Sequence, residues 1–210
     1  MQQTGFTIVD APVTMDATYS SQGPQKATFD YHINAKEFDI KKAYDNIKLF
    51  HDMASSAKGA EGQVSLDYKL TGKLNANMRP VYPSLKGGGV LSVKKVKIKG
   101  FKLFGAVGNK TDHKGIDSGD VSKVDIKTTI ANNIITIERT KMRMAGFRLR
   151  FEGQVSFDNA LNLQFRLGLP PFGLFGIPMH ITGTQDKPVI HLGNAKKEDE
   201  LKETEDADTN

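Results

Sequence analysis

The chain has 210 residues, of which 38% are apolar, 29 are basic and 24 are acidic, so its formal net charge is +5. The apolar share is sufficient for a folded core. The absence of cysteine excludes disulfides, thiol catalysis and cysteine-bound metals, and no run approaches the roughly 20 apolar residues of a membrane-spanning helix. Strand-like sequence follows Met1 almost at once, without a signal-peptide pattern. We therefore expect the chain to be a piece of a longer protein.

Charge is distributed unevenly along the chain. The range 195–210 holds seven acidic residues and three lysines, and Leu201 is its only large apolar residue. This composition predicts a disordered tail over 194–210. The segment 1–193 carries a net positive charge and is predicted to form a single domain. A basic body is typical of proteins that bind nucleic acid or anionic lipid, but it also describes a solvated surface.

The N-terminal part alternates apolar and polar residues, which is the pattern of strands with one solvated face. The alternating segments are 6–8, 13–19 and 29–33. Apolar residues near a 3.6-residue spacing then predict an amphipathic helix over 39–56, with Asp39 as its N-cap and Lys58-Gly59 as its stop. We expect the apolar stripe of this helix to pack on the sheet.

The middle of the chain mixes strands with irregular segments. Alternation predicts a strand over 63–71, and two prolines favour a short helix or an irregular turn over 72–84. Gly87 to Gly89 are predicted to form a flexible connection into a strand. The alternation of that strand changes phase at Lys94-Lys95, which indicates a β-bulge. A short helix is expected over 101–107 and a mobile polar loop over 109–120.

The C-terminal half is predicted to be a run of strands joined by short turns. Residues 124–130 and 135–137 form a hairpin that turns at Asn132-Asn133, because asparagine tolerates left-handed backbone. Further strands are expected over 142–144, 147–151, 155–157, 161–169, 177–181 and 188–192. We therefore predict a mainly β fold. It is an antiparallel, strongly twisted meander sheet that forms an open groove or a flattened sandwich, with one amphipathic helix near its N-terminal end.

Few residues have a spacing that predicts catalysis or metal binding. The five histidines are His32, His51, His113, His180 and His191. They lack the close pairs typical of metal ligands, so surface or hydrogen-bonded roles are expected. The sequence contains no nucleophile elbow, phosphate-binding loop or dinucleotide motif. Asp112, Asp117 and Asp120 share a loop, but their spacing differs from that of an EF-hand, so a solvated loop is favoured over a calcium site. We predict no catalytic residue, no metal and no cofactor.

Two groups of basic residues occur in predicted strands. They are Lys94, Lys95, Lys97, Lys99 and Lys102 in one group, and Arg139, Lys141, Arg143, Arg148 and Arg150 in the other. Most alternate with apolar residues, so we expect them on the outer face, where they keep it soluble and prevent edge pairing. Attraction to anionic lipid headgroups is a second interpretation. Nucleic-acid binding is disfavoured, because Phe147 and Phe151 have the opposite parity to the arginines between them.

The apolar faces of the strands are compatible with two architectures. Two sheets would bury each other as a sandwich, whereas a single curled sheet would leave an apolar trough for a lipid chain. The sequence periodicity is the same in both cases. For the trough, parity gives eight candidate lining residues: Ile126, Ile135, Phe147, Leu149, Phe151, Leu163, Phe165 and Leu167.

A series of short motifs in the second half of the chain has a characteristic order. It begins with GGGVLS (87–92) and VKIKGFKL (96–103), continues with a loop (109–120), paired strands (124–138) and a strand closed by glycine (144–153), and ends with IPMHITGT (177–184) and KPVI (187–190). This order resembles the C-terminal region of the AsmA family, over about residues 64–192. The turn at 131–133 departs from the usual Asp-Gly type, and the loop is divergent.

The resemblance implies a location and a function. AsmA-like proteins are anchored in the inner membrane of Gram-negative bacteria, extend through the periplasm and are related to bridge-like lipid transfer proteins built as long β grooves. We therefore expect a non-enzymatic periplasmic domain, tethered to the inner membrane by a segment outside this chain. It would shield and conduct phospholipid acyl chains and support outer-membrane biogenesis. The expected partner is phospholipid or another lipid, with envelope proteins as further candidates and no nucleic acid.

Two other functions remain open at this point. A periplasmic structural or binding module that recognises protein or carbohydrate would be a closed sandwich, with its ligand held by the polar loop around Asp112 to Asp120. A hydrolase ranks third, because it needs a cleft of convergent titratable groups that the sequence does not indicate.

Overall fold

The computed structural model describes most of the chain. The described residues are 4–8, 11–21, 23, 27–47, 50–51, 58–100, 102–113, 116, 118–169 and 175–193. The disordered tail predicted over 194–210 lies outside these ranges.

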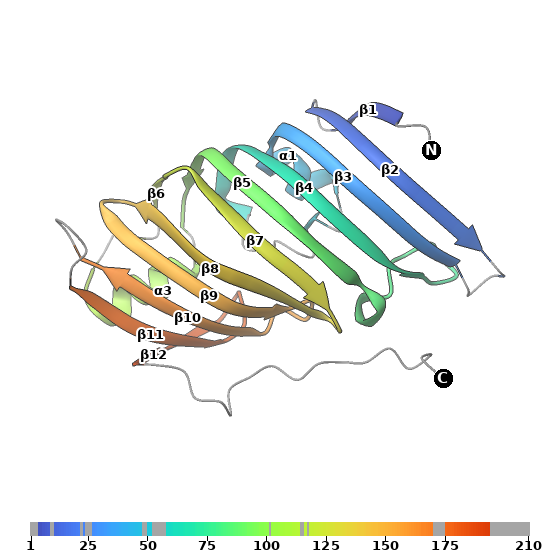
Figure 1. The fold of residues 1–210 in the computed structure, drawn as a ribbon. Coiled ribbons are helices and arrows are strands. Elements are labelled where there is room, and N and C mark those ends of the chain that lie inside the picture. The colour runs from blue at the N-terminus through green and yellow to red at the C-terminus, as the bar shows by residue number, and fades with distance from the viewer. Residues whose placement is uncertain are drawn as a thin grey trace.

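Twelve strands form one antiparallel sheet (Figure 1). They are β1 (Thr4–Ile8), β2 (Ala11–Ser21), β3 (Ala27–Asp39), β4 (Ala60–Leu74), β5 (Lys86–Ile98), β6 (Gly119–Val121), β7 (Val124–Ala131), β8 (Ile134–Met144), β9 (Phe147–Ser156), β10 (Leu161–Gly168), β11 (Gly176–Gly183) and β12 (Pro188–Leu192). Strands β1 to β5 pair in chain order, as do β7 to β12. The predicted fold class, a mainly β antiparallel meander, is therefore confirmed.

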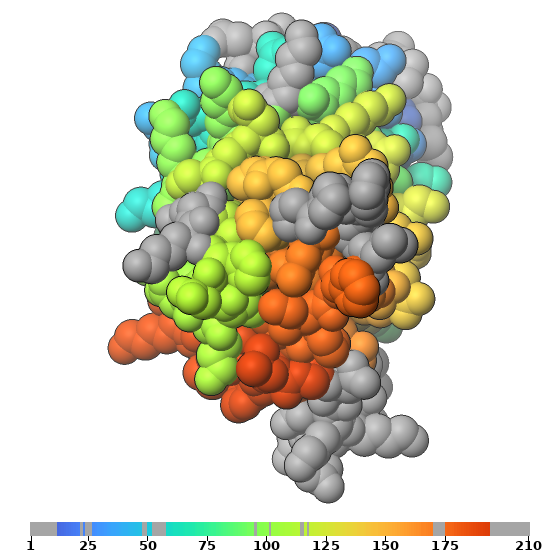
Figure 2. All heavy atoms as spheres, turned by 90° about the vertical axis from the view of Figure 1, so that its left-hand side faces the viewer, coloured from blue at the N-terminus to red at the C-terminus, as the bar shows by residue number. Residues whose placement is uncertain are grey.

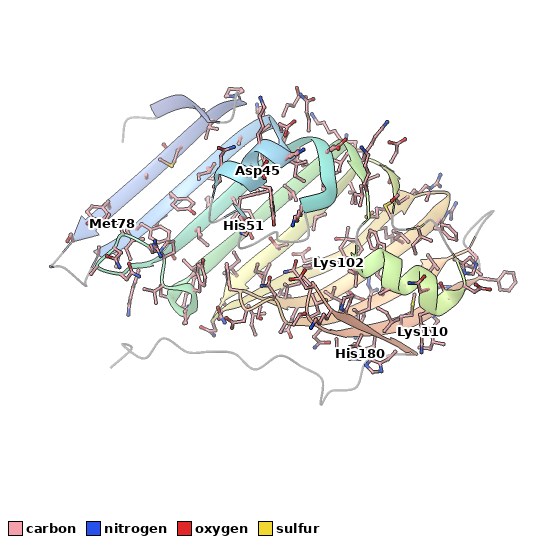
Figure 3. The ribbon with its side chains drawn as sticks, turned by 180° about the vertical axis from the view of Figure 1, so that it is seen from behind. Asp45, His51, Met78, Lys102, Lys110 and His180 are labelled. Atoms are coloured by element: carbon pink, nitrogen blue, oxygen red, sulfur yellow. The ribbon has the colours of Figure 1, made fainter. Side chains whose placement is uncertain are left out.

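In the described residues, the helices α1 (Ile40–Asn46) and α3 (Lys102–Thr111) lie on the same side of the curled sheet (Figures 1 and 3). A short 3-10 helix, η2, spans Tyr82–Ser84. Helix α1 contacts β3 and β4, whereas α3 lies against β12 (Figure 2). In the described part of the chain, helices rather than a second sheet thus cover the inner face. No helix within these ranges is long and apolar enough to cross a membrane.

Helix α1 begins where the sequence predicts but ends earlier. Asp39 is the N-cap, and its carboxylate accepts a backbone N–H three residues on at 2.8 Å. The side-chain amide of Asn46 donates to the carbonyl four residues earlier at 2.8 Å, and Ile47 is already extended. This side-chain bond competes with the helix ladder. The helix predicted over 39–56 is therefore interrupted at Ile47, although residues 50–51 are helical again, and residues 48–49 and 52–57 lie outside the described ranges.

The glycines before Val90 belong to β5 and do not form a flexible connection. Gly87 to Gly89 pair with β4 on one side and with β7 on the other. A Cβ on Gly89 would lie 2.6 Å from Cδ2 of Tyr68, and Cβ atoms on Gly87 and Gly88 would overlap backbone carbonyls of β4 and β7. Glycine is required here because the neighbouring backbones approach closely, and this corrects the sequence prediction.

The segment predicted as a mobile loop over 109–120 is structured at both ends. Helix α3 extends through Thr111, beyond the helix predicted over 101–107, and β6 begins at Gly119. Between them Ile116 is 1% exposed and belongs to the main core cluster. Because the sequence around Ile116 is polar and aperiodic, its pattern does not predict that this residue is buried. The packing of Ile116 holds the connection against the sheet.

Three β-bulges bend the strands. They occur at Lys36-Glu37 in β3, at Lys94-Lys95 in β5 and at Glu138-Arg139 in β8. The second confirms the bulge predicted from the change of phase. Each bulge places two consecutive charged residues between two inward-facing positions, so the inner face is kept while the strand bends. Glu37 has a positive φ of 55°, and its carboxylate lies 3.3 Å from Lys94 Nζ, which connects the first two bulges across β4.

The position between β5 and β8 is shared by two short strands. β6 and β7 both pair with β5 on one side. On the other side, β7 pairs with β8 only through Thr128–Ala131, and β6 pairs with it only where Val121 lies opposite Met144. Between these two points, Val124–Lys127 of β7 and Glu138–Met142 of β8 do not pair with each other. We call this gap in the ladder the β7–β8 split.

The inner face carries two hydrophobic clusters. The main cluster lies under α1 and α3 and includes residues from β2 to β11. The second cluster consists of Tyr68, Leu70, Leu85, Ile130, Ile135 and Phe157. It lies near the hairpin turn at Asn132 and Asn133, whose φ angles of 49° and 69° confirm the predicted left-handed turn. Leu66 packs against both clusters, so the core is continuous.

Candidate functional site

An apolar cavity of about 250 Å³ lies on the inner face, within the main cluster. Strands β4 to β10 form its floor, and residues of α1 and α3 form its walls. Every lining residue except Gln185 is apolar. The lining consists of Ile40, Phe50, Ala60, Leu91, Val93, Val96, Ile98, Leu103, Phe104, Val121, Val124, Ile126, Ile137, Met142, Phe151, Val155, Leu161, Leu163, Phe165 and Gln185.

The structure places the eight candidate groove residues in three different environments. Four of them line the cavity: Ile126, Phe151, Leu163 and Phe165. Leu149 and Leu167 are 1% and 0% exposed and lie in the main cluster outside the cavity lining. Phe147 packs against that cluster with its ring 5.6 Å from that of His113, and Ile135 belongs to the second cluster. Parity selects the inner face, but it does not give the position along the strand.

The cavity is not a fully packed interior. Its partly exposed members are Phe50, Leu91, Ile98, Leu103, Ile126, Ile137, Phe151 and Gln185. An apolar void of about 150 Å³ is already large enough to bind benzene. The cavity is therefore suited to a short hydrocarbon segment, such as part of an acyl chain.

Aromatic rings from both helical segments close over the sheet. The ring of Phe50, which follows α1, meets Phe38 of β3 edge-on at 5.9 Å. The ring of Phe104 in α3 lies 5.8 Å from that of Phe165 in β10. Lys102 lies at the start of α3 (Figure 3). Its Nζ forms an ion pair of 2.7 Å with Asp186. These contacts fix the walls of the cavity on two distant parts of the sheet.

Two tyrosines near the second cluster have perturbed ionisation. Burial, together with the neighbouring Tyr68, raises the pKa of Tyr31 to about 12. Burial also raises the pKa of Tyr68, and the hydrogen bond of its hydroxyl with Thr128 Oγ1 at 2.6 Å partly opposes that shift. Neither tyrosine lines the cavity. Their raised pKa values therefore reflect a buried structural pair and not an acid–base site.

The histidines of β11 and β12 form a pair that sequence spacing does not reveal. His180 and His191 lie opposite each other, with ring centres 6.0 Å apart. Asn162 Oδ1 is 2.9 Å from His180 Nε2, and Thr182 Oγ1 is 3.2 Å from His191 Nε2. The register of β11 and β12 brings these two histidines together. A rule based only on spacing along the sequence does not detect such a pair. Over the described ranges, no three His, Asp or Glu side chains converge as metal ligands.

The aspartates considered for calcium do not form a described cluster. Asp112 follows α3 with a φ of 57°, and Asp120 in β6 lies 4.0 Å from Lys97 Nζ. Asp117 lies outside the described residues.

On the outer face, cations gather beside the β7–β8 split. They line a depression of about 480 Å³ and are Lys123, Lys141, Arg143, Arg148, Arg150 and Arg166. Among the described residues, the lining contains no acidic side chain. Strand register explains the grouping, because Lys141 is opposite Arg150, which is itself opposite Arg166, and Arg143 is opposite Arg148. The predicted outward position of Lys141, Arg143, Arg148 and Arg150 is confirmed, since Met142 and Leu149 between them are buried.

Comparison of this chain with models of known protein families, with curated proteins and with solved structures finds no match. The resemblance to the AsmA family therefore stays a prediction from motif order, and function has to be argued from the geometry of the cavity and the depression.

Proposed function

We propose that this chain is a non-enzymatic lipid-handling domain of the bacterial envelope, in which the inner face of the sheet shields part of a phospholipid acyl chain from water. The observation that carries the proposal is the apolar cavity over β4 to β10, whose lining contains no acid or base. Hydrocarbon suits this lining, because each buried CH₂ group contributes about 0.8 kcal/mol. A catalytic cleft would instead need convergent titratable groups, and Gln185 offers only an amide.

The AsmA-like order of motifs supports the same proposal. In the full-length protein a segment outside this chain would tether the domain to the inner membrane. The domain would then work in the periplasm, where phospholipid passes towards the outer membrane. At about 250 Å³ the cavity is smaller than the roughly 300–1,000 Å³ typical of sites for drug-sized ligands. It therefore holds one chain segment and not a whole diacyl lipid.

The alternative proposal is an envelope module that binds protein or carbohydrate. It expects two packed sheets and a polar binding loop over 112–120. The described strands instead form one sheet, and Ile116 within that loop is buried in the core. These two observations are the reason we retain lipid handling as the proposal.

Displacement of a fluorescent fatty acid tests the cavity directly. In Ile126→Trp a larger side chain would occupy the void, because Ile126 is a partly buried lining residue. Thr129→Trp is the matched control, since Thr129 lies on the same strand and is exposed. We expect the wild type and the control to bind with similar Kd values. Ile126→Trp should weaken binding at least tenfold, which corresponds to about 1.4 kcal/mol.

A second measurement identifies the natural ligand. The protein should carry phospholipid when it is purified from native membranes and extracted for mass spectrometry. Equal fatty-acid affinity in all three proteins, or the absence of co-purified lipid together with no fatty-acid binding, would contradict the proposed function.

A further inference from the structure

The outer depression beside the β7–β8 split has an unfavourable arrangement of charge. Lys141 and Arg150 face each other on neighbouring strands, and so do Arg143 and Arg148. Like charges placed directly opposite one another destabilise a sheet. In the regular β8–β9 hairpin, which closes at Met144 opposite Phe147, both pairs fall at positions without hydrogen bonds between the two strands, where side chains are closest. The fold therefore maintains repulsion at this point.

No ion pair among the described residues relieves this repulsion. Within the described residues, Lys123, Lys141, Arg143, Arg148 and Arg150 form no ion pair with an acidic side chain. The acid in the next row, Glu152, is already held by Arg139 through bonds of 2.7 and 3.0 Å. The depression is therefore a concentrated positive site that lacks a protein counter-charge among these residues.

The split adds a backbone donor to the side-chain cations. The N–H of Arg143 donates to Ser122 Oγ at 2.7 Å, and the N–H of Ser122 donates to the Arg143 carbonyl at 2.9 Å. This edge of β8 thus faces the junction of β6 and β7. Because backbone groups alternate with a period of two, the N–H of Lys141 faces the same way, into the split, where β7 does not pair with it.

We propose that this depression is a phosphate-binding site, and that it takes the headgroup phosphate of an amphiphile. Guanidinium groups that bind in bidentate fashion, combined with a backbone N–H, are the usual partners of phosphate oxygens. The apolar cavity lies on the other face of the same part of the sheet, since Val124, Ile126 and Met142 line it on both sides of the split. The choice of a lipid as the source rests on the proposed function, whereas the phosphate chemistry does not.

Nucleic acid fits this depression less well. Among the described residues, its lining contains no aromatic side chain on which a base could stack. The cations also occupy only the β6–β7 junction and three neighbouring strands, β8 to β10, rather than a long groove. A single phosphate group matches that extent better than a polynucleotide backbone does.

Calorimetric titration of the full chain at constant ionic strength tests the proposal. The probes are inorganic phosphate and dihexanoyl phosphatidic acid below its micelle-forming concentration. We expect both to bind, with the lipid at least tenfold tighter. Arg150→Gln should weaken both at least tenfold, and Lys127→Gln, an exposed cation on β7 outside the depression, should change neither. Equal affinity for the two probes would support a phosphate-binding site but contradict the lipid headgroup as its ligand, and would assign the site to free phosphate.

Several results would overturn the proposal. One is that neither probe binds, and another is that Arg150→Gln and Lys141→Gln both bind as the wild type does. A third is a single-stranded oligonucleotide that binds more tightly than the lipid through the same residues. Two variants are used so that poor folding of one leaves the test intact. Ile126→Trp should lose fatty-acid binding and retain phosphate binding. The lipid cavity and the phosphate site are therefore tested independently, and either proposal can fail while the other stands.

Discussion

Two regions of the sheet differ on both of their faces. At the second cluster, beneath β4 and β5, Leu70 and Leu85 are 1% and 0% exposed, so the interior is filled. On the outer side of β3 and β4 beside this cluster, His32 Nε2 lies 2.6 Å from a carboxylate oxygen of Asp67. Around the β7–β8 split, the inner side is an apolar void and the outer side sets Lys141 against Arg150. The first region is arranged for stability, and the second gives up packing and charge pairing at the same place.

This comparison shows how limited the information in alternation is. Both regions have the same alternation of apolar and charged residues, and a folding argument treats them alike. They differ in which residues the register brings together, and in whether the neighbouring strand is continuous. Departures from good packing and good charge pairing are the features expected of a binding site.

The largest expected effect contrasts the two interiors. Leu70→Ala removes a fully buried side chain from the filled cluster and should reduce the free energy of unfolding by roughly 3–5 kcal/mol. Ile126→Ala enlarges an existing void at a partly exposed position and should cost only about 1 kcal/mol. Urea unfolding followed by circular dichroism measures both. Equal losses for the two variants would show that the cavity region is as well packed as the second cluster.

An intermediate effect concerns the tyrosines of the filled region. Tyr31 has a folded pKa of about 12, above its usual value of 10.0. The stabilisation is therefore complete below pH 10 and is lost as the pH rises towards 12. Because Tyr31 is partly exposed, we expect a loss of roughly 1–2 kcal/mol over this interval. Tyr31→Phe should make urea midpoints at pH 9 and 11 more alike, whereas Tyr19→Phe, at an exposed tyrosine, should leave the difference unchanged.

The smallest expected effect contrasts two cations of the outer face, Arg150 in the depression and Lys94 in an ion pair. At low salt and without phosphate, Arg150→Gln should raise the free energy of unfolding by up to about 1 kcal/mol, because it relieves repulsion. Lys94→Gln breaks the pair with Glu37 and should be neutral or slightly destabilising. Added sodium chloride should reduce the gain from Arg150→Gln by screening. A loss of stability in Arg150→Gln at low salt would mean that the depression is compensated by an anionic group of the chain.

Much of the fold follows from local sequence signals. The strand alternation, the N-cap at Asp39, the bulge at Lys94-Lys95 and the turn at Asn132-Asn133 depend on neighbouring residues, and the sequence predicts all four. Gly87 to Gly89 show where local reasoning stops. Their role depends on close approach of β4 and β7, which is a property of three strands at once.

The candidate sites depend even more on tertiary register. Half of the eight parity-selected residues line the cavity, because parity gives a face and not a location on it. The row formed by Lys141, Arg150 and Arg166 requires the alignment of three strands. One usable signal is present for the split: Val121 and Val124 face inward with two polar residues between them, as at the bulges. Interpreted in the same way as Lys94-Lys95, this pattern would have indicated an interruption of the strand between Val121 and Val124.

The curvature of this sheet depends on the one extra residue at each bulge. At each of them, removal of one charged residue would restore a regular strand, and every apolar side chain would still face inward. Deleting Lys94 alone would therefore straighten β5 without reversing its two sides. Single deletions at the three bulges would therefore yield a graded series of flatter molecules, each differing from the parent by one charged residue, with the width of the trough as the variable.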